Sequence, residues 1–322
     1  MLDLTAKWPI TPAPSWNVLD STKLQAYCDC ERKFFYEYVL GWRTKTANNH
    51  LTFGNALHQA LEHIYKNSMA PSVIAQAYEL FLTSYRKDFP EETDGIFEPK
   101  TPERAFLMLV DYAKQYSSDL HEYEILYTEV AGTVAITDYL NLSFKMDTIL
   151  KEHSSGKMLS LEHKSSQGYY NGIWPIQWPL SIQVGTYTHA LNCLFSPEET
   201  KGVIINGIFF HKTKKVEFSF KRQPVYKTND QMQVWLDTVL SRYYAILGDF
   251  EMLQGASEGD PTLKAFPLNP RSCSDYFRPC IFHDFCQAWP NPLRKAFQPP
   301  LGFMIEHWNP LEEYHTIEME LK

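Results

Sequence analysis

Apolar residues recur three and four positions apart along the first third of the chain, which is the spacing of amphipathic helices. The first such stripe begins after Ser21 or Thr22, either of which can cap a helix, and it ends at Gly41. Residues 1–17 carry three prolines and predict an irregular arm. Further stripes predict helices that open at Gly54 and that span residues 73–88 and 103–118.

The pattern then changes to short extended segments. Strands are expected at residues 125–130, 132–136, 142–150, 158–164, 203–210 and 216–220. Helical periodicity returns at residues 179–194 and again at residues 230–253. Strands that alternate with helices in this way predict an α/β protein in which helices wrap a sheet.

No linker-like segment divides the chain, so we expect one continuous body with three regions. Residues 1–120 form an N-terminal arm and helical region, and residues 121–228 form the sheet core. Residues 229–322 add a C-terminal helix and a cysteine-rich tail.

Composition narrows the classes of protein that remain. The chain has 322 residues, of which 44% are apolar and 21% charged, and this excludes disorder throughout. A net charge of -8 excludes a uniformly basic surface but allows a local basic groove. The chain lacks both a run of about 18 to 20 apolar residues and a secretory signal at residues 1–16. We therefore expect a soluble, cytoplasmic protein with no membrane partner.

Two acidic residues stand on strands that the sequence predicts to be paired. A turn centred on Ser154 and Ser155 sets opposite each other residues whose numbers sum to 309. Asp147 and Glu162 form such a pair, with Cβ atoms expected about 4.5 to 5.5 Å apart. Lys164 follows Glu162 by two positions and therefore projects from the same face of its strand.

Carboxylates this close repel each other unless a cation lies between them or one of them is protonated. Mg²⁺ and Mn²⁺ bind through a few carboxylate oxygens and keep positions free for water and phosphate, and a neighbouring lysine can orient that water. These parts suit hydrolysis of a phosphodiester. The alternative is a surface hairpin with an ordinary ion pair. A register shifted by one residue would also send the two carboxylates to opposite faces.

Three further side chains fit a site at this hairpin. Gln183 and Tyr187 lie four positions apart and so share one face of the helix that follows the strand of Glu162. His58 flanks the apolar stripe of the helix that opens at Gly54. Taken singly, residues of these types are more common in ordinary packing than in a site.

Taken in order, these residues resemble the PD-(D/E)XK nucleases, specifically their RecB-like and Cas4-like exonuclease branch. The resemblance covers the chain from about Leu19 to Trp289 and implies a restriction-endonuclease-like mixed β-sheet flanked by helices. It implies that Mg²⁺ or Mn²⁺ is held by His58, Asp147, Glu162 and the backbone carbonyl of His163. It also implies that Lys164 assists catalysis, and that the helix with Gln183 and Tyr187 supports the site and contacts DNA.

The sequence departs from this family at one position and carries one optional extra. Phe144 stands where relatives often have a glycine, three residues before the aspartate. Glu129 stands where relatives often have an acidic residue, and it is a candidate accessory, with an ordinary buried or surface carboxylate as the alternative.

The cysteines predict a second centre. Cys273, Cys280 and Cys286 fall within fourteen residues, and a site of four thiolates needs one more ligand. The candidates for the fourth ligand are Cys28, Cys30 and Cys193. The segment Cys30-Glu-Arg-Lys-Phe is similar to the start of the iron–sulfur members of this branch. That resemblance implies a structural [4Fe–4S] cluster on Cys30, Cys273, Cys280 and Cys286. Zinc is the alternative, although its sites usually contain Cys-x₂₋₄-Cys pairs.

Two segments could contact a nucleic acid. Residues 201–227 contain seven lysines or arginines and one acidic residue, and His211–Lys215 is expected as a hairpin tip. Such a tip can follow phosphates, or it can simply keep a sheet edge soluble. The segment between Lys164 and Gln183 is aromatic, with tyrosines at 169 and 170 and tryptophans at 174 and 178. These rings could stack on bases or separate strands, and equally they could cover the core.

We therefore expect a metal-dependent deoxyribonuclease, an exonuclease on single-stranded or end-frayed DNA. The competing interpretation is an iron–sulfur DNA-binding subunit whose nuclease site is vestigial or depends on a partner. The sequence leaves open the digestion polarity, the strand preference, DNA against RNA, and the oligomeric state. Partners from phage replication, host recombination or repair, and CRISPR adaptation all remain compatible with it.

Overall fold

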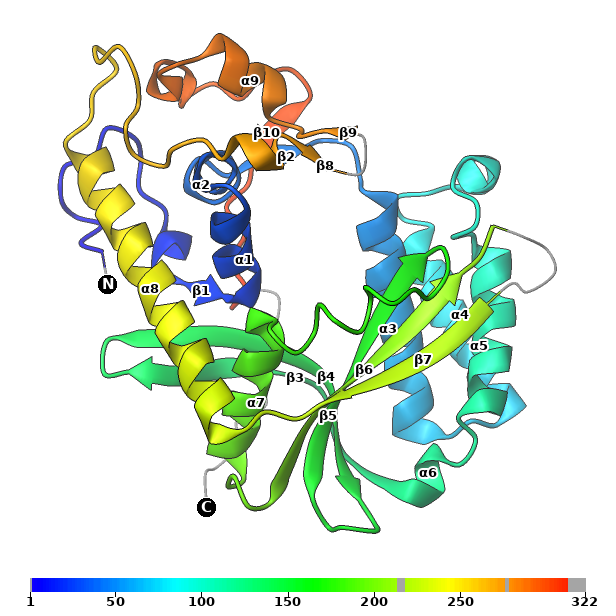
Figure 1. Ribbon diagram of the computed structural model, residues 1–322. Coiled ribbons are helices and arrows are strands. Elements are labelled where there is room, and N and C mark those ends of the chain that lie inside the picture. The colour runs from blue at the N-terminus through cyan, green and yellow to red at the C-terminus, as the bar shows by residue number, and fades with distance from the viewer. Residues whose placement is uncertain (1, 213–217, 276–277, 312–322) are drawn as a thin grey trace. The chain divides into compact units, whose positions relative to one another are not determined.

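The computed structural model describes residues 2–212, 218–275 and 278–311 of the chain. These residues form two compact units, each assembled from segments that are distant in the sequence (Figure 1). The first unit takes the described residues of 1–46, 132–144 and 229–315. The second unit takes those of 47–131 and 145–228.

The second unit is built on a mixed β-sheet. Its strands are β3 (Tyr123–Thr137) and β4 (Leu140–Glu152), which both continue into the first unit, and β5 (Met158–Gln167), β6 (Thr200–Phe210) and β7 (Phe218–Val225). The pairing is antiparallel between β4 and β5, parallel between β5 and β6, and antiparallel between β6 and β7. A parallel pair needs a crossover connection, and the helix α7 (Ile182–Leu194) belongs to the one between β5 and β6.

Helices cover both faces of this sheet. One face packs against α3 (Asn49–Asn67), α4 (Pro71–Tyr85) and α5 (Pro102–Gln115), and α7 lies on the other face (Figure 1). The unit also contains the short α6 (Asp119–Glu122) and the 3-10 helix η3 (Glu91–Ile96). Leu159 and Leu161 of β5 join the core with Leu57 and Met108, and each such side chain contributes about 1.5–3 kcal/mol on burial.

The first unit is mostly helical and aromatic. Its helices are η1 (Pro14–Asn17), α1 (Ser21–Asp29), α2 (Glu31–Phe34), the π-helical η2 (Phe35–Val39), α8 (Asn229–Gln254), η4 (Pro270–Ser272), α9 (His283–Ala288) and η5 (Pro292–Lys295). Its short strands are β1 (Leu19–Asp20), β2 (Trp42–Thr44), β8 (Ser274–Asp275), β9 (Arg278–Pro279) and β10 (Phe303–Ile305). Parallel pairing joins Leu19 of β1 to Leu142 at the start of β4, and β10 is antiparallel to β2. Trp16, Phe250 and Phe266 form part of its core.

The predicted α/β class, with a mixed sheet flanked by helices, is confirmed, but several helix starts were wrong. Asp20 caps the first helix in place of Ser21 or Thr22, because its carboxylate accepts a hydrogen bond from the Lys23 amide at 2.8 Å. The helix expected to open at Gly54 begins five residues earlier, where Asn48 caps it. The helix expected from residue 179 begins at Ile182, since Ser181 is its cap.

Other boundaries also differ from the expectation. The stripe from residue 21 to Gly41 is not one helix, because Cys30 is extended, with φ −167°, and separates α1 from α2. The strands expected at 125–130 and 132–136 are a single strand, β3. The tip expected at His211–Lys215 and the start of the strand at 216–220 fall largely outside the described residues. None of the described helices combines the length and apolar character needed to cross a lipid bilayer.

Candidate active site

The carboxylates predicted to face each other lie where β4 and β5 part. The ladder between these strands ends at the pair Thr148 and Leu161, so paired residue numbers sum to 309 as the sequence predicts. One further step places Asp147 opposite Glu162. There the Asp147 carboxylate takes the place of a backbone partner, and its Oδ2 accepts a hydrogen bond from the His163 amide at 2.7 Å. The one-residue shift that would separate the two acids is therefore excluded.

Helix α3 brings a histidine to the aspartate. His58 Nδ1 lies 3.0 Å from Asp147 Oδ1. Burial would raise the pKa of Asp147, but the charge and hydrogen bond of His58 outweigh it, so the pKa lies well below its usual range. Burial would likewise lower the pKa of His58, but the neighbouring Asp147 raises it. The two groups therefore form an ion pair when no other cation is bound.

Glu129 of β3 reaches the same point. One ligand atom from each of His58, Glu129 and Asp147 lies within 4.8 Å of the other two. Glu129 has φ +52°, a left-handed conformation that is rare for a residue other than glycine, and it forms an ion pair with Lys145. Burial raises the pKa of its carboxyl group. Sequence reasoning kept this residue only as an accessory, although an isolated acid inside an apolar strand was the available signal.

The other predicted residues gather around Glu162. Lys164 Nζ donates to Glu162 Oε1 at 2.8 Å, and Gln183 Nε2 approaches the same oxygen at 3.5 Å. Gln183 also donates to the Tyr187 hydroxyl at 2.9 Å, so the two residues share one face of α7 as expected. The Tyr187 hydroxyl in turn donates to the backbone carbonyl of Lys145. Gln183, at the start of α7, thus contacts the Glu162 carboxylate from the side of this helix.

Glu162 is a buried carboxylate of which only one oxygen has a hydrogen-bond partner among the described residues. Its side chain is 3% exposed, and its Oε2 is buried with no hydrogen-bond partner among the described residues. Burial raises the pKa of Glu162 to about 7, with a further contribution from Asp147 and an opposing one from Lys164. Burial lowers the pKa of Lys164, but Glu162 and Asp147 outweigh it and raise the value above the ordinary range. A lysine that stays charged beside two acids suits the binding of a phosphate.

His163 turns its ring away from these groups. Its Nδ1 faces Asn206 Nδ2 at 2.8 Å, and Asn206 also donates to the Tyr112 hydroxyl at 2.7 Å. Burial lowers the pKa of the His163 ring to about 3, so the ring is neutral. The resemblance assigns only the backbone carbonyl of His163 to the metal, and the orientation of the ring is compatible with that assignment.

A buried polar network continues behind His163, and no sequence pattern predicted it. The Tyr65 hydroxyl donates to Asp119 Oδ2 at 2.6 Å and meets the Tyr112 hydroxyl at 2.9 Å. Arg222 pairs with both oxygens of Asp119. Arg222 and Lys201, which pairs with Glu152 at 2.7 Å, were counted among the basic residues of segment 201–227. Their ion pairs leave fewer cations of that segment for phosphates.

The four expected cluster cysteines all belong to the first unit. Burial raises the pKa of Cys286 to about 11, with smaller contributions from the charges of Cys30 and Cys280. Burial also raises the pKa of Cys280, with added effects from Cys30 and Cys273. Burial also raises the pKa of the Cys28 thiol, with an opposing effect from Arg242 and added effects from Asp29 and Glu31. All six cysteines are free thiols.

Arg32 explains why Cys30 meets the tail. Its guanidinium donates to the carbonyls of Phe266 at 2.8 Å and Leu263 at 2.9 Å, and this holds the later segment beside the break between α1 and α2. Asn269 then donates its amide to Cys30 Sγ at 3.5 Å, and the Cys280 amide bonds the Cys273 carbonyl at 2.9 Å. Among the described residues, the ligand atoms that lie within 4.8 Å of one another are those of His58, Glu129 and Asp147, so the four thiols do not form a closed set of ligands in this structure. Thiols are nevertheless the donors that zinc and iron–sulfur clusters take.

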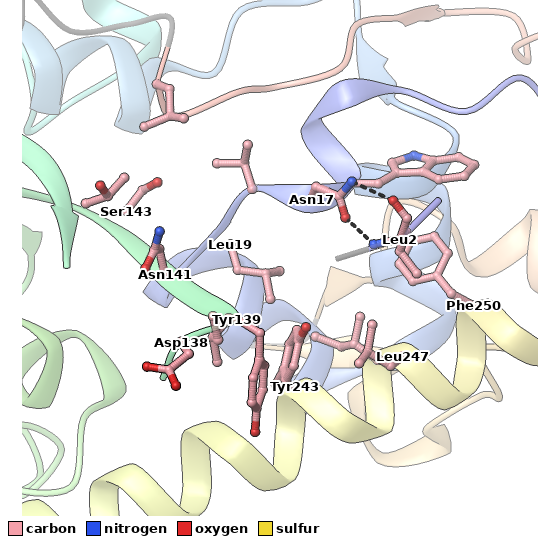
Figure 2. Close-up of a pocket in the computed structure, with 16 residues that line it drawn as sticks. Leu2, Asn17, Leu19, Asp138, Tyr139, Asn141, Ser143, Tyr243, Leu247 and Phe250 are labelled. Atoms are coloured by element: carbon pink, nitrogen blue, oxygen red, sulfur yellow. Dashed lines mark hydrogen bonds between the residues drawn. The ribbon is translucent and has the colours of Figure 1, made fainter. Parts of the chain in front are cut away.

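The first unit also contains a cavity of about 300 Å³, between the start of the chain, the β3–β4 hairpin and α8 (Figure 2). Asn17 is held at its wall by two hydrogen bonds with the backbone of Leu2, at 2.7 and 3.0 Å. Asp138 is the one carboxylate among its described lining residues. The cavity thus offers no pair of acids, and the candidate chemistry lies in the second unit.

A mixed sheet with two carboxylates and a lysine on adjacent strands is an arrangement typical of hydrolytic nucleases. The chain belongs to the PD-(D/E)XK nuclease superfamily, whose sequence model matches residues 21–287. No curated protein matches the chain.

Two solved structures are remotely similar to the chain. A candidate exonuclease from Eubacterium rectale is 13% identical with a TM-score of 0.45, and the alignment covers 84% of this chain and 93% of that one. An alkaline exonuclease from Laribacter hongkongensis is 11% identical with a TM-score of 0.27, over 64% of this chain and 96% of that one. Likenesses this remote do not bear on substrate or cofactor.

Proposed function

We propose that this protein is a metal-dependent DNA exonuclease of the RecB-like and Cas4-like branch, acting on single-stranded or end-frayed DNA. The observation that carries the proposal is the buried pair of Asp147 and Glu162 beside the ammonium group of Lys164. Two acids and a lysine from neighbouring strands are the parts that hydrolysis of a phosphodiester requires.

The residues fit Mg²⁺ or Mn²⁺. His58, Asp147 and Glu162 would hold the ion, because the first two face each other and Glu162 keeps a buried oxygen without a hydrogen-bond partner among the described residues. The carbonyl of His163 points to the same side of its strand as the amide that meets Asp147, so it is a fourth candidate ligand. Glu129 is a fifth. When bound, the ion would supply an activated water and offset charge on the phosphate.

The protein's own side chains have separate roles in this proposal. Lys164 keeps its proton, orients the attacking water and pairs with a phosphate oxygen. Gln183 and Tyr187 hold Glu162 in place from α7 and lie where a DNA strand would approach. Asp147 is held by the amide of His163, so it does not need to reorganise when the ion binds.

The competing function is an iron–sulfur DNA-binding subunit with a vestigial or partner-dependent nuclease site. One observation favours it: Glu162 is engaged by Lys164 and Gln183, and it is not in the group of ligand atoms formed by His58, Glu129 and Asp147. Purified protein incubated with labelled single-stranded DNA and Mn²⁺ separates the two functions, since the subunit would bind the DNA without degrading it.

Lys164→Ala and Asp147→Ala test the nuclease directly. We expect each to lower Mn²⁺-dependent digestion at least about 10²-fold, because Lys164→Ala removes the charge that orients the water and Asp147→Ala removes a ligand of the metal. Lys114→Ala, at an exposed lysine of α5, is the matched control and should digest DNA like the wild type. Undiminished digestion by either site variant would refute the assignment.

We propose further that Cys30, Cys273, Cys280 and Cys286 hold a structural [4Fe–4S] cluster, with zinc as the alternative. Support comes from the contacts that bring the later segment to Cys30 and from the thiol donors that such a cluster takes. The helical region, the core and the cysteine tail would act as one catalytic body in the cytoplasm. Recombination, replication or CRISPR-adaptation proteins are its candidate partners.

A further inference from the structure

The segment 168–181 joins the two halves of the candidate site. It starts after β5, four residues beyond Lys164, and it ends at the cap of α7, two residues before Gln183. Gln183 Nε2 lies 3.5 Å from Glu162 Oε1, and Leu180 precedes Gln183 by three residues, a chain length of at most about 11 Å. We call residues 168–181 the site loop.

Trp174 anchors the site loop to the sheet. Its side chain is 8% exposed and packs on Phe209 of β6, with ring centroids 5.3 Å apart. A Cβ atom at Gly207 would lie 2.5 Å from the Trp174 ring, so the absence of a side chain at this position makes room for the tryptophan. Asn171 Oδ1 accepts hydrogen bonds from the Ile173 and Trp174 amides at 3.0 and 3.1 Å. These contacts fix the part of the loop around Trp174 against β6.

Above this anchor the site loop exposes large aliphatic side chains. Ile173 is 74% exposed, Ile176 is 69% exposed and Leu180 is 86% exposed. Pro175 and Pro179 restrict the backbone between them, and the β-branched isoleucines have few rotamers. Exposing apolar side chains to water costs free energy. Three of them on one short loop therefore point to a binding partner.

Cations flank these aliphatic groups. Lys221 Nζ lies 5.7 Å from the centroid of the Tyr170 ring, and Lys227 Nζ donates to the carbonyl of Pro179. A lipid or an apolar protein surface matches the aliphatic groups alone. A nucleic acid matches both, since its phosphates meet the lysines and its bases meet the apolar side chains.

We propose that the site loop is a wedge that unpairs the ends of duplex DNA beside the metal site. Leu180 and Ile176 insert between terminal base pairs, as aliphatic side chains of other DNA-binding proteins insert between base steps. One strand then follows the lysines past Glu162 and Lys164. The inference rests on the proposed nuclease function and names its substrate as the duplex end.

A duplex that carries 2-aminopurine at its terminal pair tests the wedge. The fluorescence of this base rises when it leaves the stack, and EDTA in the buffer prevents digestion during the measurement. We expect the wild-type protein to raise the fluorescence and Leu180→Ser with Ile176→Ser to lose the rise. The control is Ile96→Ser, because Ile96 is 73% exposed on η3 of the same unit. No rise with the wild type, or an equal rise with the double variant, overturns the wedge.

Digestion assays distinguish this inference from the proposed function. We expect the double variant to digest blunt duplex about tenfold more slowly and single strands at the wild-type rate, since only the duplex has a stack to open. If the wild-type protein digests neither substrate, the proposed nuclease function is rejected. The fluorescence assay, which needs no digestion, would still test the wedge. Wild-type oligomers that the variant lacks, with unchanged digestion, would make the loop a protein interface and overturn the proposal.

Discussion

Asp147 and Glu162 are both buried carboxylates, yet their surroundings move their pKa values in opposite directions. His58 supplies the compensating charge for Asp147, whereas Glu162 faces the negative charge of Asp147 with one oxygen unpaired. Pairs of titratable groups with separated pKa values are typical of catalytic sites. In the metal-free protein the ionised form of Glu162 is therefore destabilised by burial and by Asp147, and a divalent cation would stabilise it.

The raised pKa of Glu162 predicts a pH dependence of stability in chelator-treated protein. The unfolded chain loses this proton near pH 4.5, whereas the folded protein keeps it up to about pH 7. The free energy of unfolding should thus fall as the pH rises from about 4.5 to 7. In Glu162→Gln this fall should be smaller, with the raised pKa values of Glu129 and His58 among its remaining causes.

Melting temperatures of both proteins between pH 4.5 and 8 measure the difference. Glu79→Gln, at an exposed position of α4, is the control and should follow the wild type. Parallel melting curves for the wild type and Glu162→Gln across this range would contradict a buried, protonated Glu162.

At the scale of the elements, the end of the β4–β5 ladder creates the site. The sequence predicted this part well, because turn chemistry at Ser154 and Ser155 fixed the register and hence the meeting of Asp147 and Glu162. Spacing alone could not predict that His58 would reach Asp147, since that contact joins residues 89 positions apart, and only the family resemblance implied it. The network from Asn206 to Asp119 was missed for the same reason, because buried polar partners have no period along the chain.

Two glycines of the second unit predict opposite effects of the same substitution. Gly54 lies inside α3 with nothing within 4 Å of an added Cβ, so Gly54→Ala should stabilise the protein by about 0.5–1 kcal/mol. Gly207→Ala would meet the Trp174 ring and should destabilise by about 1–3 kcal/mol.

Urea denaturation followed by circular dichroism measures both changes, and tryptophan fluorescence reports whether Trp174 moves. A neutral Gly207→Ala variant with unchanged fluorescence would show that the site loop can relax around the extra methyl group.

Across the whole molecule, the cysteine group joins α1 and α2 to a tail more than 240 residues later. Closing so long a loop removes much conformational freedom from the unfolded chain, although the gain grows slowly with length. A cluster at this point would therefore act on the stability of the first unit, not on the chemistry of the second.

Cys280→Ser should remove the cluster. We expect anaerobically purified wild-type protein to be brown and to contain iron, and the variant to be colourless with a lower melting temperature. Cys193→Ser and Cys28→Ser are the controls, because Cys193 is exposed and neither residue is among the four proposed ligands. Colourless wild-type protein that contains zinc would decide for the alternative metal, and loss of colour in Cys28→Ser would reassign the fourth ligand.

The interleaving of the two units has a consequence for biosynthesis. The described segments of the second unit end at residue 228, whereas those of the first come from both the early and the late part of the chain. During synthesis on the ribosome, the described segments of the second unit can thus fold first. The early helices, with Cys30 among them, can pack only when the later residues of the first unit have been made. If the proposed cluster forms, iron delivery to the thiols would be among the last maturation events, and truncated translation products would lack it while retaining the candidate site carboxylates.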